Sequence, residues 1–310
     1  MVIYASSGAD ILCPFYKKDG IPFTGYQYQL PIALELGEPY YWFPENGYGF
    51  VGQEAGFADW LEKEWMPKYW KEARPLRVAY IWPETVTSRA QHPGGLETYV
   101  VGKKDIEYAE GMFQSCVVSD ASVELTRFVG ESVDWLYTSN VPAGASTNLK
   151  DIVRLGFKDK MNVAITTYGY DPLLIKLAGE ASEGVYGQVM TALPYEGVPG
   201  VKFCDALASK YRPEMVGSTL YYEGVMVVLV LEEALRVALE TVGYENMSRE
   251  AVREAYMSIK DFDAMGLCPP VTIDRPGYAM PGIDHYFRMG IIENGKVKAV
   301  SDWVLAPDVR

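Results

Sequence analysis

The sequence has little positive charge, and the charge that it has is not clustered. Its 310 residues include 28 Lys and Arg against 41 Asp and Glu, which gives a formal net charge of −13 and a pI near 4.7. A phosphate backbone or an anionic membrane surface attracts clustered Lys and Arg. We therefore expect no nucleic-acid partner, and membrane association only through another protein or a lipid anchor not visible in the sequence.

Cysteine and histidine are also scarce. His92 and His285 lie far apart along the chain, and no two cysteines form a C-x-x-C pair. Structural zinc sites and redox motifs depend on such closely spaced residues. We expect no metal site, no cofactor and free thiols that behave as small buried hydrophobic groups, with disulfide pairing left open. The cysteines are Cys13, Cys116, Cys204 and Cys268.

No hydrophobic run is long enough to cross a bilayer. The most apolar stretch, 225–231, is much shorter than the roughly 20 residues that a spanning helix needs, and Glu232 and Glu233 follow it at once. We expect it to form a buried core helix. The first residues, MVIYASSGAD, have neither a basic n-region nor a long h-region, so no secretory signal is visible. Either the protein stays inside the cell or the chain lacks its true beginning.

The chain does have ample apolar material for a large core and for two lobes, with 49% hydrophobic and 22% charged residues. Short apolar runs alternate with amphipathic stretches of helical length, which is typical of βαβ units and a largely parallel sheet. The expected strands are 1–6, 21–26, 40–45, 76–82, 112–119, 133–139, 162–168 and 184–193. The expected helices before residue 199 are 8–20, 52–73, 94–111, 123–132, 146–157 and 171–182.

After Pro199 the pattern becomes helical. We expect helices over 199–213, 218–243 and 248–259, the last with an N-cap signal in MSREAV. The tail, 286–304, has two apolar-alternating runs joined by Asn294-Gly295, a strong β-hairpin signal.

Evidence for an enzyme is thin. Gly47, Gly49 and Gly52 match G-x-G-x-x-G, but FPEN precedes the motif and a charged helix lies where the acidic residue should follow, so we expect them to shape a loop and a helix start. No G-x-S-x-G motif occurs, and Ser6 and Ser7 have no histidine nearby in sequence. We expect no catalytic residues. A nucleotide-dependent α/β oxidoreductase remains the alternative from another class, and a nucleotide-binding assay would test it.

Several predicted strands end in clusters of hydroxyl, amide and aromatic side chains. Such residues also form turns and helix N-caps, which is the simpler interpretation of any single cluster. In open α/β sheets, however, ligands bind beyond the carboxyl ends of the strands, so recurrence of the clusters favours a binding site. The clusters contain Ser6 and Ser7; Tyr26, Gln27 and Tyr28; Trp82; Thr138, Ser139 and Asn140; and Thr167, Tyr168, Tyr170 and Asp171.

The order of these elements resembles the type I periplasmic binding proteins of branched-chain amino acid ABC transporters, the leucine/isoleucine/valine-binding family. The most specific pieces are LAGEASEGVYG, ALRVALE with the following SREAVREAY, and FDAMGLCPPVTI; RVAYIWPE and KVKAVSDWV also match. The resemblance covers nearly the whole chain. Family members have a further β-α-β-α segment and a signal peptide before the strand matching MVIYAS, which implies a truncated gene model, a fragment or a divergent first lobe.

The resemblance implies an α/β fold of two lobes joined by three crossing strands, with the solute held between lobes that close over it. The first lobe would comprise residues 1–75 and 196–286, and the second 76–195 and 287–310. The protein would be a non-enzymatic component of an ABC importer that acts in the periplasm or another extracytoplasmic space and delivers its solute to a membrane permease complex. A ligand-sensing regulator of the same fold is the alternative.

The resemblance also places site residues. The carboxylate-binding serine falls on Ser6 or Ser7, a second contact pair on Gln27 and Tyr28, and the aromatic residue of the second lobe near Asn140. The acidic residue that neutralises an α-ammonium falls on Thr167, and a buried ammonium without a carboxylate partner is costly. An ordinary aliphatic amino acid is therefore disfavoured. Together with Tyr26, Trp82, Tyr168 and Tyr170, this points to an amino acid-like or, better, an aromatic carboxylate solute.

Overall fold

The computed structural model describes residues 2–3, 15, 18, 24–25, 49–85, 88–89, 96–273 and 286–307. The chain divides into two compact units, which we describe separately. The first unit comprises Met1–Gly49, Pro194–Tyr286 and Arg310, and the second comprises Phe50–Leu193 and Phe287–Val309. Residues 50–75 thus fall in the second unit, although the sequence places them in the first lobe. The lobes themselves remain a prediction.

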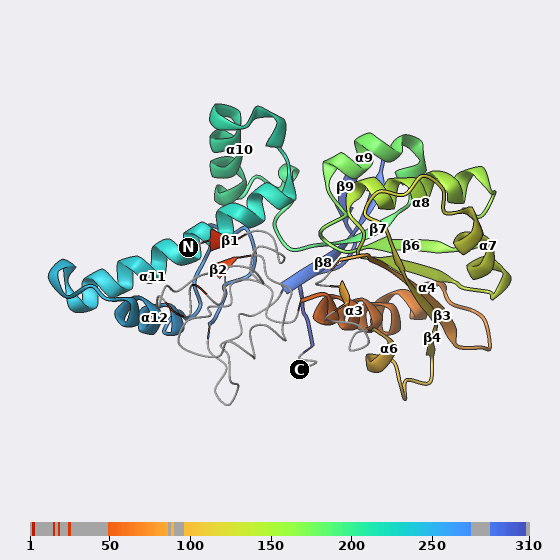
Figure 1. The fold of residues 1–310 in the computed structure, drawn as a ribbon, viewed down its shortest axis with the longest axis horizontal. Helices are drawn as coiled ribbons and strands as arrows, with labels where there is room; N and C mark the ends of the chain where they lie inside the picture. The colour runs from red at the N-terminus through yellow and green to blue at the C-terminus, as the bar shows by residue number, and fades with distance from the viewer. Residues whose placement is uncertain are drawn as a thin grey trace. The chain divides into compact units, whose positions relative to one another are not determined.

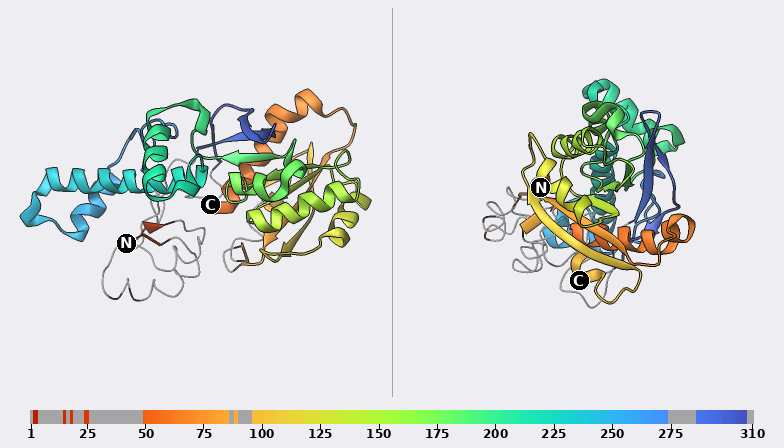
Figure 2. Two further views of the ribbon diagram at one scale, coloured as in Figure 1. Left: turned by 90° about the horizontal axis from the view of Figure 1, so that it is seen from above. Right: turned by 90° about the vertical axis from the view of Figure 1, so that its right-hand side faces the viewer.

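A mainly parallel sheet forms the centre of the second unit, as predicted. Its strand order is β10-β8-β7-β6-β5-β3-β4, with β9 paired to β8, and only the pairs of β7 with β8 and of β8 with β9 are antiparallel among those recorded. Figure 2 shows the β8–β9 hairpin at the side of this sheet. The strands are β3 (Leu76–Pro83), β4 (Ile106–Gln114), β5 (Trp135–Thr138), β6 (Asn162–Ile165), β7 (Tyr186–Val189), β8 (Tyr286–Glu293), β9 (Lys296–Ala299) and β10 (Val304–Leu305).

Helices α7, α8 and α9 cover one face of the sheet, and α3 covers the other (Figure 1). On the first face, Leu125 of α7, Leu149 of α8 and Leu174 of α9 pack against the sheet residues Leu136 and Ile165. Burial of these side chains supplies the main favourable contribution to folding. The helices of this unit are α3 (Gly49–Trp60), η1 (Leu61–Trp65), α4 (Met66–Tyr69), α6 (Leu96–Tyr99), α7 (Ser122–Gly130), α8 (Pro142–Arg154), α9 (Pro172–Ala178) and η2 (Gly179–Ser182).

Aromatic rings fill the space between α3 and the sheet. Phe57 of α3 stacks on Tyr137 with ring centroids 4.4 Å apart, and Tyr137 stacks on Tyr80 at 5.1 Å. Trp60 meets Trp135 edge to face at 5.9 Å. Because side chains alternate between the faces of a strand, the aromatic positions 135 and 137 lie on this face while Leu136 lies on the other.

The first unit is mainly helical in its described part. Ser218 caps α11 by accepting a hydrogen bond from the Tyr221 amide, and Ser248 caps α12 in the same way at Ala251, as MSREAV predicts. Helices α11 and α12 pack side by side (Figure 1). The elements are β1 (Val2–Ile3), β2 (Thr24–Gly25), η3 (Pro194–Glu196), α10 (Pro199–Tyr211), η4 (Pro213–Met215), α11 (Thr219–Val242), η5 (Tyr244–Asn246) and α12 (Arg249–Met257).

The apolar run of α11 lies only partly in the core. Met226, Val227 and Val230 are buried, but Val228 is 56% exposed, so one face of this helix meets other side chains and the other does not. Within the described ranges, no helix combines the length and the apolar composition needed to cross a membrane.

The helix predicted over 94–111 is wrong for most of its length. Only α6 is helical there, and the chain then forms β4, which pairs in parallel with β3 along its whole length. The segment carries Lys and Glu residues, which favour helices locally, but the hydrogen bonds to β3 outweigh that preference. The hairpin prediction is confirmed. Asn294 and Gly295 both have positive φ, 54° and 69°, and join β8 to β9.

Candidate functional site

A row of polar and aromatic side chains lies where the central strands of the second unit end. In the register of the sheet, Ile81 pairs with Thr138, Thr138 with Ile165, and Ile165 with Gly187. The next residue along each strand is therefore on the α3 face. We call these four residues the carboxyl-edge row: Trp82, Ser139, Thr166 and Gln188. Backbone bonds extend the ladder to this level, from Ser139 N to Ile81 O (3.2 Å) and from Thr166 N to Thr138 O (3.0 Å).

Helix α3 lies over this row and bonds to it at two residues. Gln188 donates from Nε2 to the carbonyl of Gln53 (2.8 Å) and accepts at Oε1 from the Tyr137 hydroxyl (2.6 Å). Trp82 donates from Nε1 to Glu54 Oε1 (3.2 Å). All of these side chains are at most 4% exposed. The row and the start of α3 thus form one buried polar layer at the carboxyl edge of the sheet.

Glu54 is a carboxyl group inside this layer. Its burial raises the pKa from 4.5, the ordinary glutamate value, to about 8, although a hydrogen bond from the Leu96 amide lowers the pKa in part. Burial acts this way because the ionised form loses more hydration than the neutral form. Glu54 is consequently protonated and uncharged at neutral pH in the folded protein.

Two polar atoms of this layer have no hydrogen-bond partner among the described residues. They are Gln53 Nε2 and Thr166 Oγ1, and their side chains are fully buried. Ser139 is different, because its hydroxyl lies at the Tyr80 hydroxyl. A buried polar atom without a partner costs about 1 to 3 kcal/mol, so such atoms in a native protein call for a structural or functional explanation. An amide donor and a hydroxyl together can bind a carboxylate, carbonyl or hydroxyl group of a small molecule.

The structure brings some of the predicted site residues to this layer. Trp82 belongs to the row. Thr167 follows it directly and donates to Gln53 Oε1 at 3.4 Å, the outer limit for such a bond. Asn140 lies next to Ser139, but its amide is used internally, because it donates to Gln114 Oε1 (2.9 Å) and accepts from the Val141 amide (2.8 Å).

Other predicted residues are occupied in packing. Tyr170 is 1% exposed and its ring lies on Gly187 and Gly290, which pair across β7 and β8; any Cβ at Gly187 would overlap the ring. Its hydroxyl donates to Val185 O (3.2 Å). Asp171 accepts from the Leu173 amide and caps α9, so the N-cap interpretation describes its role. Tyr168 is half-buried.

The remaining predicted ligand residues lie outside the described part of the chain: Ser6, Ser7, Tyr26, Gln27 and Tyr28.

Sequence patterns alone missed four residues of the layer, namely Gln53, Glu54, Thr166 and Gln188. The sequence did contain a signal for Thr166. Side chains alternate between the two faces of a strand, so Thr166 shares a face with Ala164, whereas the predicted residue Thr167 does not. Gln53 and Glu54 look like ordinary polar positions of an amphipathic helix. Only the packing of α3 against the sheet shows that they are buried.

The described residues hold no group of three or more His, Cys, Asp or Glu side chains placed to bind a metal ion. Three cysteines form no disulfide with a described residue; Cys204 and Cys268 are buried as expected, whereas Cys116 is half-buried. Cys13 lies outside the described residues. Gly49 is the first residue of α3 and Gly52 lies within this helix.

The chain is similar in sequence to a known family. Residues 4–285 match the family model described as periplasmic binding protein, which is most of the chain. Among curated proteins, none matches this sequence significantly.

Solved structures share the fold at low sequence identity. A branched-chain amino acid ABC transporter protein from Thermus thermophilus with bound valine has a TM-score of 0.77 at 20% identity, with 98% of this chain and 77% of that one covered. A solute-binding protein from R. palustris in complex with benzoate has a TM-score of 0.71 at 14% identity, with 96% and 76% covered. A fatty acid ABC transporter substrate-binding protein from Thermomonospora curvata has a TM-score of 0.73 at 16% identity, with 99% and 75% covered.

Proposed function

Because this chain belongs to the periplasmic binding protein family, we propose that it is the extracytoplasmic component of an ABC importer that captures a small aromatic carboxylate and delivers it to a membrane permease. It performs no chemistry on the solute. The observation that carries the proposal is the buried layer at the carboxyl edge of the second unit, where Gln53 and Thr166 each keep a polar atom without a partner among the described residues.

The charge of this layer argues for the solute class. Among the described residues of the layer, the carboxyl group is that of Glu54, which is protonated at neutral pH. By the resemblance, the acidic residue of amino-acid binders falls on Thr167 in this chain. An α-ammonium group would thus lose its hydration here without gaining a carboxylate partner, which is unfavourable. A carboxylate or carbonyl oxygen, by contrast, accepts hydrogen bonds from hydroxyl and amide donors. One structural neighbour binds valine and another benzoate, so the fold accommodates both classes.

Calorimetric titration of the chain with benzoate, 4-hydroxybenzoate, leucine and valine tests the solute class. We expect at least one aromatic acid to bind at least tenfold more tightly than leucine. Tight leucine binding with no response to either aromatic acid would contradict the proposed class while leaving the family assignment intact. Small-angle scattering with and without the bound acid would test the predicted closure of the lobes.

Replacing Thr166 by valine is expected to weaken solute binding about three- to tenfold, the loss of one hydrogen bond, with little or no loss of stability. The reason is that the Thr166 hydroxyl has no partner among the described residues, so valine removes no recorded bond and keeps the shape of the side chain. Calorimetry and thermal unfolding of the same samples measure the two effects.

Thr138→Val is the matched control. The Thr138 hydroxyl donates to Ile81 O (2.9 Å) and accepts from the Asn140 amide (3.1 Å), so its removal should lower stability by about 1 to 3 kcal/mol. If Thr166→Val also destabilises the protein and leaves affinity unchanged, the hydroxyl of Thr166 has a structural role and does not bind solute.

A further inference from the structure

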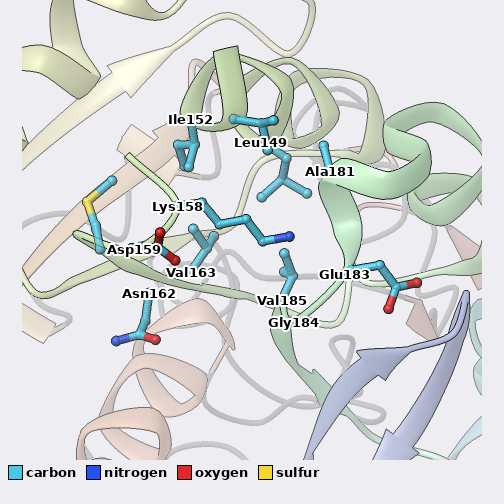
Figure 3. Close-up of a pocket in the computed structure, with 12 residues that line it drawn as sticks. Leu149, Ile152, Lys158, Asp159, Asn162, Val163, Ala181, Glu183, Gly184 and Val185 are labelled. Carbon is cyan, nitrogen blue, oxygen red and sulfur yellow. The ribbon is translucent and has the colours of Figure 1, made fainter. Parts of the chain in front are cut away.

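A cavity lies at the other end of the same sheet, where β6 and β7 begin (Figure 3). Its volume is about 210 Å³. Helix α8, the loop that follows it, η2 and the first residues of β6 and β7 surround the cavity. Its residues all come from the second unit, and none belongs to the carboxyl-edge row.

Apolar side chains form one wall of the cavity, and Lys158, Asp159, Asn162 and Glu183 also line it. Leu149 and Ile152 from α8, Met161 and Val163 at β6, and Val185 at β7 line it, and each of these side chains is at most 6% exposed. A dry apolar cavity of about 150 Å³ is large enough to bind benzene. The space is therefore sufficient for one aromatic ring or a chain of about six carbons with a small head group.

The charge at the mouth is supplied by Lys158. Its Nζ points over the apolar wall towards Ala181 and Val185, as Figure 3 shows, and it forms no ion pair or hydrogen bond with a described residue. The nearby Glu183 is engaged elsewhere, because its carboxylate accepts from the Asn294 amide (2.8 Å) and the Gly295 amide (2.6 Å) of the β8–β9 hairpin.

Asp159 is the other acidic residue at the cavity. No ion pair is recorded between its carboxylate and Lys158 Nζ, and Figure 3 draws the two groups apart. The ammonium group therefore has one side facing the hydrophobic space and no recorded counter-charge.

We propose that this cavity is a binding site for a small amphiphilic carboxylate, with its ring or short chain against Leu149, Ile152 and Val163 and its carboxylate at Lys158 Nζ. The affinity is modest, with a Kd of roughly 0.1 to 1 mM for eight or nine heavy atoms. The site does not depend on the proposed function, since it uses none of the residues that would contact the imported solute.

Amide NMR spectra of the isotope-labelled chain titrated with benzoate, hexanoate and the uncharged hexan-1-ol test this site. We expect saturable shifts at Asn162, Gly184 and Val185 for both acids and weaker binding of the alcohol. Shifts at Ser139 and Thr166 report solute binding separately, so the two sites are distinguishable in one titration. Absence of shifts at the cavity up to 10-fold the expected Kd, of the order of 10 mM, would overturn the proposal.

Two variants and one control complete the experiment. Ala181→Leu fills the cavity and should abolish the shifts at Gly184 and Val185, while Lys158→Gln should weaken acid binding about two- to fivefold and leave hexan-1-ol binding unchanged. Lys160→Gln, a nearby exposed lysine that does not line the cavity, should change neither. If Ala181→Leu does not fold, Lys158→Gln decides alone. If Lys158→Gln and Lys160→Gln weaken the binding of the acids equally, the effect is one of general charge, and the proposed site is wrong.

Discussion

Replacing Trp135 by alanine is expected to lower the free energy of unfolding by about 3 to 5 kcal/mol. Trp135 is fully buried, and its ring meets Trp65 edge to face at 5.1 Å and Tyr186 at 5.2 Å, in addition to Phe57 and Trp60. Alanine would leave a large cavity at the centre of this aromatic cluster, which the packed helix and sheet cannot fill. Guanidinium unfolding followed by far-ultraviolet circular dichroism measures the loss.

Trp135→Phe is the matched control. The indole Nε1 of Trp135 has no hydrogen-bond partner in the part of the chain that the structure describes, so phenylalanine removes no recorded bond and keeps most of the ring contacts. We expect it to cost less than half as much as alanine. If the phenylalanine variant is destabilised as much as the alanine variant, the Trp135 Nε1 donates a bond that matters, and ring packing is not the main contribution.

The pH dependence of stability is expected to carry a large contribution from Glu54. The folded-state pKa of about 8 lies above the ordinary 4.5, so between these values the folded protein binds a proton that the unfolded chain does not. The free energy of unfolding therefore falls as pH rises, by up to about 1.4 kcal/mol per pH unit and roughly 5 kcal/mol in all. The contribution is fully present below about pH 4.5 and is lost above about pH 8.

Glu54→Gln should flatten this pH profile, because glutamine does not ionise. Its amide can accept only one of the two hydrogen bonds that Glu54 receives from the Leu96 amide and from Trp82 Nε1, so the variant should be less stable than the natural chain near pH 5. Near pH 8.5 it should be equally or more stable. The two curves of unfolding free energy against pH are thus expected to cross.

Subtracting the two profiles isolates Glu54 from other titrating groups, including both histidines. The pKa of Asp59 lies below its usual range, because its hydrogen bonds to Lys63, Tyr99 and Lys103 outweigh its partial burial, so its contribution is lost only at more acidic pH. Glu64→Gln, in η1, serves as the matched control for the exchange of a glutamate for a glutamine. Parallel profiles for the natural chain and Glu54→Gln would show that Glu54 is ionised when folded.

Local patterns predicted most elements because their signals are local. Turn chemistry placed the Asn294-Gly295 hairpin, a serine N-cap placed the start of α12, and alternating or continuous apolar runs placed β3, β5 and β6. The failure at β4 has a clear reason. A Lys- and Glu-rich segment favours a helix when considered alone, and only the neighbouring strand β3 supplies the hydrogen bonds that make it a strand.

The candidate site shows the same division. The sequence predicted that strand ends would carry the polar side chains of a ligand site. The structure places Trp82, Asn140 and Thr167 at that edge, and their role in binding stays a prediction. The sequence did not show that the Asn140 amide bonds to Gln114, that the Tyr170 ring lies on two glycines, or that the Thr166 hydroxyl has no partner among the described residues. These facts depend on residues distant in sequence.

By itself, the sequence determined that this is an acidic α/β protein of the periplasmic binding type, because composition, strand and helix periods and family motifs are properties of short segments. Only the tertiary structure decided which polar groups are buried together. Helix α3 lies on the sheet of the second unit and brings Gln53 and Glu54 to the ends of its central strands, where loss of water raises the pKa of one carboxyl group. Gln53 Nε2 and the Thr166 hydroxyl have no partner there among the described residues. Burial and pairing are set by contacts between segments, which no single segment encodes.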